Sequence, residues 1–333
     1  MYEKEKTITF NPPAISTLTT NQIKKEQENP SGLRTGIIGF DSEIDGDKKF
    51  KRMRPEKFIP VLGAQSNFKT GFMLAIADNV VEQIDKEKDV VVYVTWEQSV
   101  EEQGMLDLSR ISKISAASMY DGNISATEWD RILSASIERA ETPLWMLGHA
   151  GGGSGGRRPR LTVTDVENAL AYIQDYQGKK IRFVVLDYIQ RINREDKKRD
   201  GGTREQFMAV VDHCKDLGLM FKAPCMVGSQ VKRDVATREW KQPRIDDGQE
   251  TSNLEHTADQ MITLWMPKTT EPLGSILEYG GESIMVTPYT LLAWVAKQKF
   301  GEAPLLFKYD VIPQYNKIVR YGTAPAVLKE MLK

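Results

Sequence analysis

The chain has 333 residues and a formal net charge of −1, which fits one large α/β domain or two small ones and excludes a global positive charge that attracts nucleic acid. Its 2 cysteines and 3 histidines match neither a disulfide framework nor the spacing of metal ligands, so we expect reduced thiols in a cytoplasmic protein. No apolar run reaches the roughly 18 residues of a membrane helix, and the polar N-terminus excludes a secretory signal, so we expect no membrane partner.

Residues 1–35 are polar and contain several prolines. Within them, residues 16–28 are predicted to form a short helix with Ile15, Leu18 and Ile23 toward one side, too few apolar side chains for a core. This segment is either a tail without fixed structure or an arm that docks on a neighbouring subunit. We therefore divide the chain into an N-terminal arm or linker, residues 1–35, and a main domain, residues 36–333.

A strand, a loop and a helix are predicted in succession around residue 63. An apolar run ends at Gly63, a small polar loop follows, and Lys69 and Thr70 precede the amphipathic run 71–84. The spacing is that of a P-loop, in which backbone N–H groups and the helix N-terminus hold a phosphate. The lysine then reaches the β/γ-phosphates and the threonine hydroxyl ligates Mg²⁺. The predicted nucleotide-binding residues are Gly63, Ala64, Gln65, Ser66, Asn67, Phe68, Lys69 and Thr70.

One residue departs from the P-loop pattern. Phe68 stands where the second glycine of the motif is expected, and its side chain adds a Cβ and a ring beside the phosphate cradle. Two interpretations stay open from this stretch alone. It is an altered nucleotide site, or it is a strand-to-helix turn with a chance Lys-Thr pair.

The next elements predict a parallel sheet. Residues 89–94 form a β-branched run typical of a strand buried on both faces, and Glu97 follows at its carboxyl end, where open α/β sheets bind ligands. Residues 100–140 have helical periodicity, and residues 144–147 form a short strand. The glycine- and arginine-rich segment 151–160 is either a loop that contacts a polyanion or a solvated surface loop.

The pattern of alternating elements continues to about residue 265. A helix is predicted over 164–176 with Thr164 as its N-cap, followed by the apolar strand 181–187, which ends in Asp187 as Walker B strands do. A further helix, 205–221, precedes the strand 224–228 and then Gln230. This alternation predicts a doubly wound, mainly parallel sheet. Short strands at 284–287, 291–296, 305–309 and 318–321 predict an antiparallel C-terminal extension of the same sheet.

Seven short blocks follow one another in a specific order. They are Gly39-Phe40-Asp41 with Ile44-Asp45, the P-loop, Thr95-Trp96-Glu97-Gln98-Ser99, Val185-Leu186-Asp187-Tyr188-Ile189-Gln190, Ser229-Gln230-Val231-Lys232-Arg233, residues 247–259, and Ala296-Lys297-Gln298-Lys299-Phe300-Gly301. Together they resemble the RecA-like motor domain of the bacterial replicative DNA helicase family (DnaB-type, superfamily 4) from about residue 36 to residue 321. The Asp187–Gln190 stretch is the most specific block.

The resemblance implies a RecA-like P-loop ATPase fold with ATP and Mg²⁺ as cofactors. Besides Lys69, it implies that Glu97 polarises the attacking water as general base, and that Asp187 holds the metal with Thr70. Gln230 would sense the γ-phosphate. Lys297 and Lys299 would reach the nucleotide of the neighbouring subunit.

The resemblance also implies partners. Its nucleotide sites lie between subunits, so we expect a homo-oligomer, usually a hexamer, and replication partner proteins. Two basic segments, 191–204 and 232–244, correspond to loops that grip single-stranded DNA, although each could equally be a solvated face. The predicted DNA-binding residues are Arg191, Arg194, Lys197, Lys198, Arg199, Lys232, Arg233, Arg238, Lys241 and Arg244.

Three departures from the family pattern bear on the function. Phe68 replaces a glycine, Lys299 replaces the arginine that acts on the neighbouring subunit, and only about 35 residues precede the motor, without the family's primase-binding domain. They favour a relative from a phage, plasmid or other mobile element, or a specialised ATPase. Two functions are therefore compared: an oligomeric Mg-ATP-dependent helicase or translocase on single-stranded DNA, and a nucleotide-switched or weakly hydrolysing DNA-binding ring or clamp without unwinding activity.

Overall fold

The computed structural model describes residues 12–41, 50–149, 161–192, 203–248, 252–279 and 282–322. Within them, nine strands form one sheet in the order β11-β10-β9-β6-β1-β5-β4-β2-β3. The block from β6 to β3 is parallel, and β9, β10 and β11 are antiparallel. The strands are β1 (Phe58–Gly63), β2 (Asp89–Thr95), β3 (Leu144–Leu147), β4 (Lys180–Asp187), β5 (Cys225–Gln230), β6 (Gln260–Trp265), β9 (Thr290–Gln298), β10 (Leu305–Ile312) and β11 (Lys317–Arg320). This is the predicted mainly parallel sheet with an antiparallel extension.

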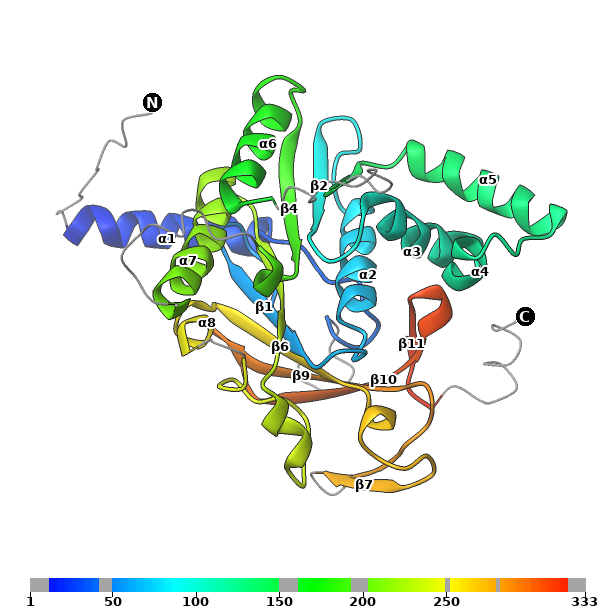
Figure 1. Ribbon diagram of the computed structural model, residues 1–333. Helices are drawn as coiled ribbons and strands as arrows, with labels where there is room; N and C mark the ends of the chain where they lie inside the picture. The colour runs from blue at the N-terminus through cyan, green and yellow to red at the C-terminus, as the bar shows by residue number, and fades with distance from the viewer. Residues whose placement is uncertain are drawn as a thin grey trace.

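Helices cover both faces of this sheet, as Figure 1 shows. On one side lie α2 (Lys69–Val81), α3 (Val100–Ser112), α4 (Ala116–Tyr120) and α5 (Ala126–Ala140); on the other lie α6 (Val163–Asp175), α7 (Thr203–Phe221) and α8 (Ser252–Thr257). Each side has its own core of buried side chains against the sheet. Four charged residues link α3 and α5 to α2, because Arg110 and Arg139 both pair with Asp78 and Asp107.

Helix α2 differs from its prediction. It begins at Lys69 and ends at Val81, and it is buried on nearly every side rather than amphipathic. The sheet, α3 and the segment around Phe40 surround it, so an apolar residue is accommodated at almost every position. This burial fixes the direction of the helix whose N-terminus carries the P-loop.

Two further predictions are wrong in detail. The N-cap of α6 is Thr162 rather than Thr164: the Thr162 hydroxyl accepts from the Asp165 N–H at 3.1 Å, and the Asp165 carboxylate accepts from the Thr162 N–H. The strand expected at 284–287 does not join the main sheet. It is part of a separate two-stranded sheet of β7 (Ile276–Tyr279) and β8 (Glu282–Met285), which packs through buried Ile284 against Trp265.

Helix α1 (Pro12–Glu28) covers the helix predicted in the N-terminal segment. Apart from half-buried Glu26, its residues from position 16 onward are exposed, and Leu18 and Ile23 are each 63% exposed. Glu26 connects it to the main domain through Arg54, 3.2 Å away. Among the described helices, none is both long and apolar enough to cross a bilayer.

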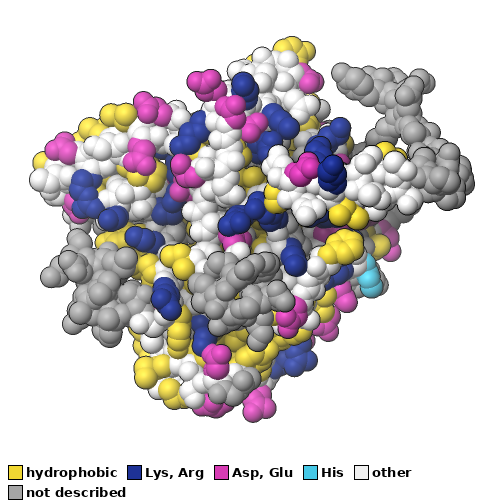
Figure 2. Space-filling model, turned by 180° about the vertical axis from the view of Figure 1, so that it is seen from behind, with side chains coloured by type: hydrophobic (Ala, Val, Ile, Leu, Met, Phe, Trp, Pro, Cys, Tyr) yellow, Lys and Arg dark blue, Asp and Glu magenta, His cyan; other side chains and the backbone are white. Residues whose placement is uncertain are grey.

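The surface carries charges of both signs. Figure 2 shows Lys and Arg side chains interspersed with Asp and Glu on the face opposite to Figure 1, rather than a patch of one sign. This distribution agrees with the formal net charge of −1. Any binding of a polyanion must therefore depend on local groups of cations.

Candidate nucleotide-binding site

A pocket of about 410 Å³ lies at the carboxyl ends of the parallel strands. The loop after β1, the residues after β2, and the ends of β4 and β5 all reach it, which is where open α/β sheets bind ligands. Segments after β6 and β10 complete the wall. The sequence-predicted residues that line it are Gln65, Ser66, Asn67, Phe68, Lys69, Thr70, Glu97, Asp187 and Gln230.

Lys69 is the first residue of α2, and its side chain is buried in the loop. Its Nζ donates to the carbonyl oxygens of Gly63 at 2.7 Å and Ala64 at 2.9 Å. Burial lowers the pKa of Lys69 to about 8, against the opposing effect of Asp187 and Glu97. At neutral pH the ammonium group is therefore mostly charged and able to bind phosphate oxygens.

Asn67, a variable position of the P-loop motif, holds the P-loop in place. Asn67 is 2% exposed, and its Oδ1 accepts from the N–H of Met266 at 2.6 Å. Met266 directly follows β6 and also lines the pocket. The P-loop, which continues from β1, is thus also hydrogen-bonded to the residue that follows the neighbouring strand β6.

Phe68 adopts the left-handed conformation that the motif glycine favours, with φ of 63°. Its ring packs over the first turn of α2, where a Cβ on Gly71 would lie 2.6 Å from the ring carbon Cζ. The ring lines one wall of the pocket and contacts the core on the α2 side. Gly71 therefore makes room for the ring that Phe68 introduces, and the loop keeps the P-loop course.

This pairing gives a testable prediction. Gly71→Ala alone is expected to destabilise the protein by about 1–3 kcal/mol, because the added methyl group collides with the Phe68 ring. In the Phe68→Gly background the same change should cost much less. Urea unfolding of the two single variants and the double variant measures the coupling energy. Strictly additive effects would show that the two residues do not constrain each other.

Asp187, at the end of β4, is 3% exposed and lies beside Thr70 and Tyr93. Its Oδ2 accepts from Thr70 Oγ1 at 2.7 Å and from the Tyr93 hydroxyl at 2.8 Å. Burial raises the pKa of Asp187, although these hydrogen bonds and Lys69 act in the opposite direction. Among the described residues, its buried Oδ1 has no hydrogen-bond partner. A carboxylate oxygen without a partner next to a threonine hydroxyl fits Mg²⁺, a cation that prefers oxygen ligands.

Glu97 and Gln230 occupy the ends of the strands on either side of β4. Glu97 is exposed toward the pocket, and partial burial, with the Asp187 charge, raises its pKa. Gln230 is held through its backbone: its N–H donates to Gln190 Oε1 at 3.1 Å, and Gln190 Nε2 donates to Ser229 Oγ at 2.9 Å. The Gln230 side chain is thereby left to face the pocket that it lines.

The pKa values predict a bell-shaped dependence of kcat/KM for ATP on pH. Glu97 must be ionised to accept a proton, and its pKa is raised, so the acidic limb should lie above the ordinary glutamate value of 4.5. Lys69 loses its charge as pH rises through about 8, so the alkaline limb should begin there. Lys69→Arg keeps the charge to high pH and should remove the alkaline limb, whatever activity remains. A profile for the unmodified protein that stays level well above pH 8 would contradict this assignment.

Lys297 and Lys299 lie far from this pocket. Lys297 pairs in register with Met261 at the start of β6, whereas Met266, just beyond its end, lines the pocket. Strand β6 has 6 residues, so its two ends lie roughly 20 Å apart. The Lys297 Nζ donates to the Glu255 carbonyl at 2.6 Å, and the Lys299 Nζ to Asp259 Oδ1 at 2.7 Å. Within one chain, these lysines do not reach the nucleotide site.

The predicted DNA-binding residues have different surroundings. Arg191 is exposed and donates from Nε to the Tyr188 hydroxyl at 2.8 Å, and Lys232 Nζ donates to the Asp246 carbonyl at 3.1 Å. Arg244 is exposed. Two others are in ion pairs, Arg238 with buried Asp247 and Lys241 with Glu271. Arg194, Lys197, Lys198 and Arg199, together with the side chain of Arg233 and the segment 151–160, lie outside the described structure.

Several residues in the pocket or directly behind it were not predicted from the sequence. Tyr93 does not line the pocket but bonds to Asp187 from behind it. It is the one aromatic residue of the buried strand β2 and stands among four valines, which is the signal that could have singled it out. Burial, reinforced by Asp187, raises its pKa, so its hydroxyl stays a donor. Lys268, Thr269, Pro313 and Asn316 enter from the antiparallel half of the fold. No local motif marks these four residues.

Comparison with known proteins identifies relatives of this chain. A family model described as the DnaB-like helicase C terminal domain matches residues 32–303. The replicative DNA helicase DnaB of Nostoc sp. is 26% identical over 253 residues, which are 74% of this chain and 26% of that protein. Replicative DNA helicase DnaC of Bacillus subtilis is 22% identical over 244 residues, 73% of this chain and 49% of that protein. The chain thus spans a quarter to half of the length of these relatives.

Solved structures agree on the fold. One of them, described as an ATPase domain, superposes with a TM-score of 0.72 at 19% identity, covering 94% of this chain and 99% of that one. A DnaB-like replicative helicase, solved in a study of its interactions with primase, gives a TM-score of 0.71 at 19% identity, covering 96% of this chain and 68% of that one. The predicted RecA-like fold is confirmed. With most of its length matched by the family model, the chain belongs to the DnaB-like helicase C-terminal domain family.

Proposed function

We propose that this chain is the ATPase motor of an oligomeric, Mg-ATP-dependent helicase or translocase that acts on single-stranded DNA. The observation that carries the proposal is the meeting of Lys69, Thr70, Asp187, Glu97 and Gln230 around one pocket. Glu97, Asp187 and Gln230 come from the ends of three different strands, and Lys69 and Thr70 come from the P-loop helix, so their convergence is a property of the fold.

The chemistry follows from their positions. Backbone N–H groups of the P-loop and Lys69 bind the phosphates, and Thr70 with Asp187 would hold Mg²⁺. The metal, when bound, neutralises charge that develops on the transferred phosphoryl group. Glu97 takes the proton of the attacking water, for which its raised pKa suits it. Gln230, fixed by Gln190, contacts the γ-phosphate and reports its presence to the segment that begins at Lys232.

The arrangement of the chain supports assembly into a ring, which we propose to be a hexamer. Lys297 and Lys299 lie roughly 20 Å from their own P-loop, so they can act only on a site in another subunit. Helix α1 supports the interpretation as an arm, because it exposes Leu18 and Ile23. On α5, Trp129, Leu133 and Ile137 form an exposed apolar stripe that can receive such an arm from a neighbouring copy.

DNA binding is proposed for the segments that follow β4 and β5. Arg191, Lys232 and Arg244 are exposed there, whereas the ion pairs of Arg238 and Lys241 support a role in shaping the second segment. We also propose replication proteins as partners and the cytoplasm as location. The substitutions Phe68 and Lys299 support an origin in a phage, plasmid or other mobile element.

The test measures ATP turnover of the assembled protein with and without single-stranded DNA, with and without Mg²⁺, alongside its native mass. A motor should give an oligomer whose Mg²⁺-dependent turnover rises when DNA is added. Nucleotide-dependent DNA binding without turnover would instead establish the alternative, a nucleotide-switched clamp. Absence of both nucleotide binding and DNA binding would reject both functions.

A further inference from the structure

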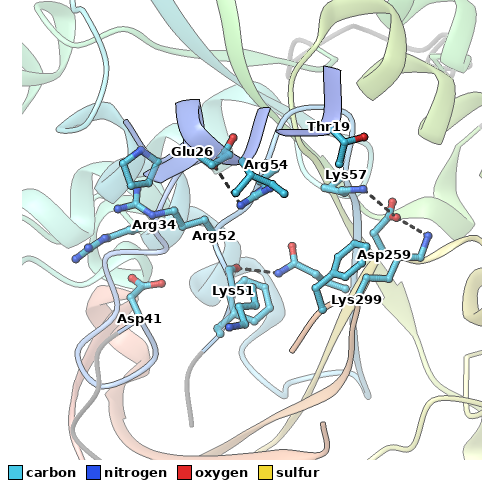
Figure 3. Close-up of a pocket in the computed structure, with 15 residues that line it drawn as sticks. Thr19, Glu26, Arg34, Asp41, Lys51, Arg52, Arg54, Lys57, Asp259 and Lys299 are labelled. Atoms are coloured by element: carbon cyan, nitrogen blue, oxygen red, sulfur yellow. Dashed lines mark hydrogen bonds and ion pairs between the residues drawn. The ribbon is translucent and has the colours of Figure 1, made fainter. Parts of the chain in front are cut away.

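A second and larger pocket lies at the opposite edge of the sheet from the P-loop. Its volume is about 760 Å³, and its walls come from α1, from the segment leading into β1 and from the turn after β9. Six Lys or Arg side chains and three Asp or Glu side chains line it, so it favours an anion. Figure 3 shows Lys57 and Lys299 approaching one carboxylate, that of Asp259, from two elements.

Asp259 holds two ammonium groups at one oxygen. Its Oδ1 lies 2.7 Å from Lys299 Nζ and 3.5 Å from Lys57 Nζ. The carboxylate itself is fixed, because its side chain is 5% exposed and its Oδ2 accepts from the Phe58 N–H at 3.1 Å. The Asp259 carbonyl also accepts from the Lys299 N–H at 2.9 Å. The start of β1 and the end of β9 are thereby joined through this single residue.

The charge balance leaves this cluster cationic. One carboxylate neutralises one of the two ammonium groups, and burial of Asp259 is outweighed by the Lys299 hydrogen bond, the Phe58 amide and the Lys57 charge, so its pKa is lowered and it stays ionised. The Lys57 and Lys299 side chains are 34% and 49% exposed. Both ammonium groups can therefore contact an anion that enters the pocket while Asp259 keeps them close together.

We propose that Lys57 acts together with Lys299 on the phosphate oxygens of the triphosphate bound by the adjacent subunit, and that Asp259 is the positioning residue for both. The inference rests on the proposed function, in which Lys299 faces that neighbouring nucleotide. A single lysine offers one compact charge, whereas a guanidinium offers a planar fork of donors. Two ammonium groups on one carboxylate, one just before β1 and one just after β9, supply two points of contact and so replace that fork.

The single variants test the chemistry. Lys57→Met should lower kcat by about tenfold with little change in KM, because the neighbouring subunit's own P-loop binds the nucleotide while Lys57 stabilises the charge that develops during phosphoryl transfer. Lys57→Arg should restore most of the rate, and Asp259→Asn should lower kcat without weakening nucleotide binding. Lys86 is the matched control, since it is 48% exposed and pairs with a single carboxylate, Glu82, at 2.9 Å. Lys86→Met should leave kcat unchanged. An unchanged kcat in Lys57→Met overturns the proposal.

Mixed oligomers test whether Lys57 acts across the boundary. Lys57→Met subunits are mixed equally with Lys69→Ala subunits, and the rate is compared with that of wild type mixed equally with Lys69→Ala. If Lys57 acts on the neighbour, half of the intact P-loops face an intact Lys57, and the rate should reach about half of the reference. A rate that stays at about one tenth of the reference overturns the inference. Glu97→Gln serves as the inactive partner if Lys69→Ala does not assemble.

A parallel mixture separates this inference from the proposed function. Lys299→Met with Lys69→Ala should also regain activity if subunits complete one another's sites. Recovery with Lys299→Met but not with Lys57→Met rejects the role of Lys57 alone. Failure of both mixtures, with assembly confirmed by native mass, rejects the shared site and with it the basis of the proposal.

Discussion

Replacing Glu97 by glutamine is expected to lower kcat for ATP hydrolysis by about 10²–10⁴-fold while changing ATP affinity little. Glutamine keeps the shape and the polar contacts of glutamate but cannot accept a proton from water. The pKa of Glu97 is raised by burial and by Asp187, which makes its carboxylate a better base at neutral pH. Single-turnover hydrolysis measures the chemical step, and nucleotide binding is measured separately by titration.

The matched control is Glu138→Gln, an exposed carboxylate on α5 that lies outside the nucleotide pocket, and it should leave kcat unchanged. If Glu97→Gln also leaves turnover unchanged, water is activated by another group and Glu97 is no general base. If the unmodified protein shows no turnover to lose, the clamp function becomes the better account of the same pocket.

Asp187→Asn is expected to lower kcat for ATP hydrolysis by about 10³-fold or more, while raising the melting temperature at neutral pH. The expected loss of turnover follows from the proposed role of Asp187 as a charged ligand for Mg²⁺. The gain in stability follows from burial, which raises the pKa of Asp187 and makes its ionised form costly in the folded state. Asparagine has a similar shape and its amide oxygen can still accept from Thr70 and Tyr93.

The sign of this effect gives a second measurement. The folded-state pKa of Asp187 is raised, so the folded protein favours the protonated acid, and the difference in melting temperature between variant and parent should shrink as pH falls and Asp187 becomes neutral. Melting curves at several pH values without nucleotide or Mg²⁺ provide the test. A variant that is less stable than its parent at neutral pH would show that the charged carboxylate stabilises the fold, contrary to the prediction.

The sequence predicts those parts of the pocket that are encoded locally. The P-loop needs a fixed spacing between Gly63 and Lys69, and Asp187 ends an apolar run, so each is visible within a few residues. The wall formed by Asn316 and Lys268 is not visible in this way, because it depends on how the antiparallel strands fold back over the loop. Only the tertiary structure brings these residues to the P-loop.

The errors have similar causes. Thr162 and Thr164 are two residues apart, and the choice of N-cap depends on which hydroxyl meets Asp165, which periodicity alone does not decide. The placement of 284–287 in the main sheet fails because a short apolar run does not specify its partner. In the structure, residues 282–285 pair with residues 276–279, which precede them. Ile284 packs against Trp265, whereas Ile276 and Met285 stay exposed. Pairing is decided by long-range packing rather than by the run itself.

Strand β6 has a mechanical consequence for an assembled ring. Its first end adjoins Asp259, which fixes Lys299, and its last end adjoins Met266, which is bonded to Asn67 of the P-loop. Because β6 is hydrogen-bonded to a strand on each side, it cannot bend freely between these ends. In a closed ring, β6 would be a rigid element that connects two successive subunit interfaces. The state of one nucleotide would then influence the position of the lysines proposed to serve the next site.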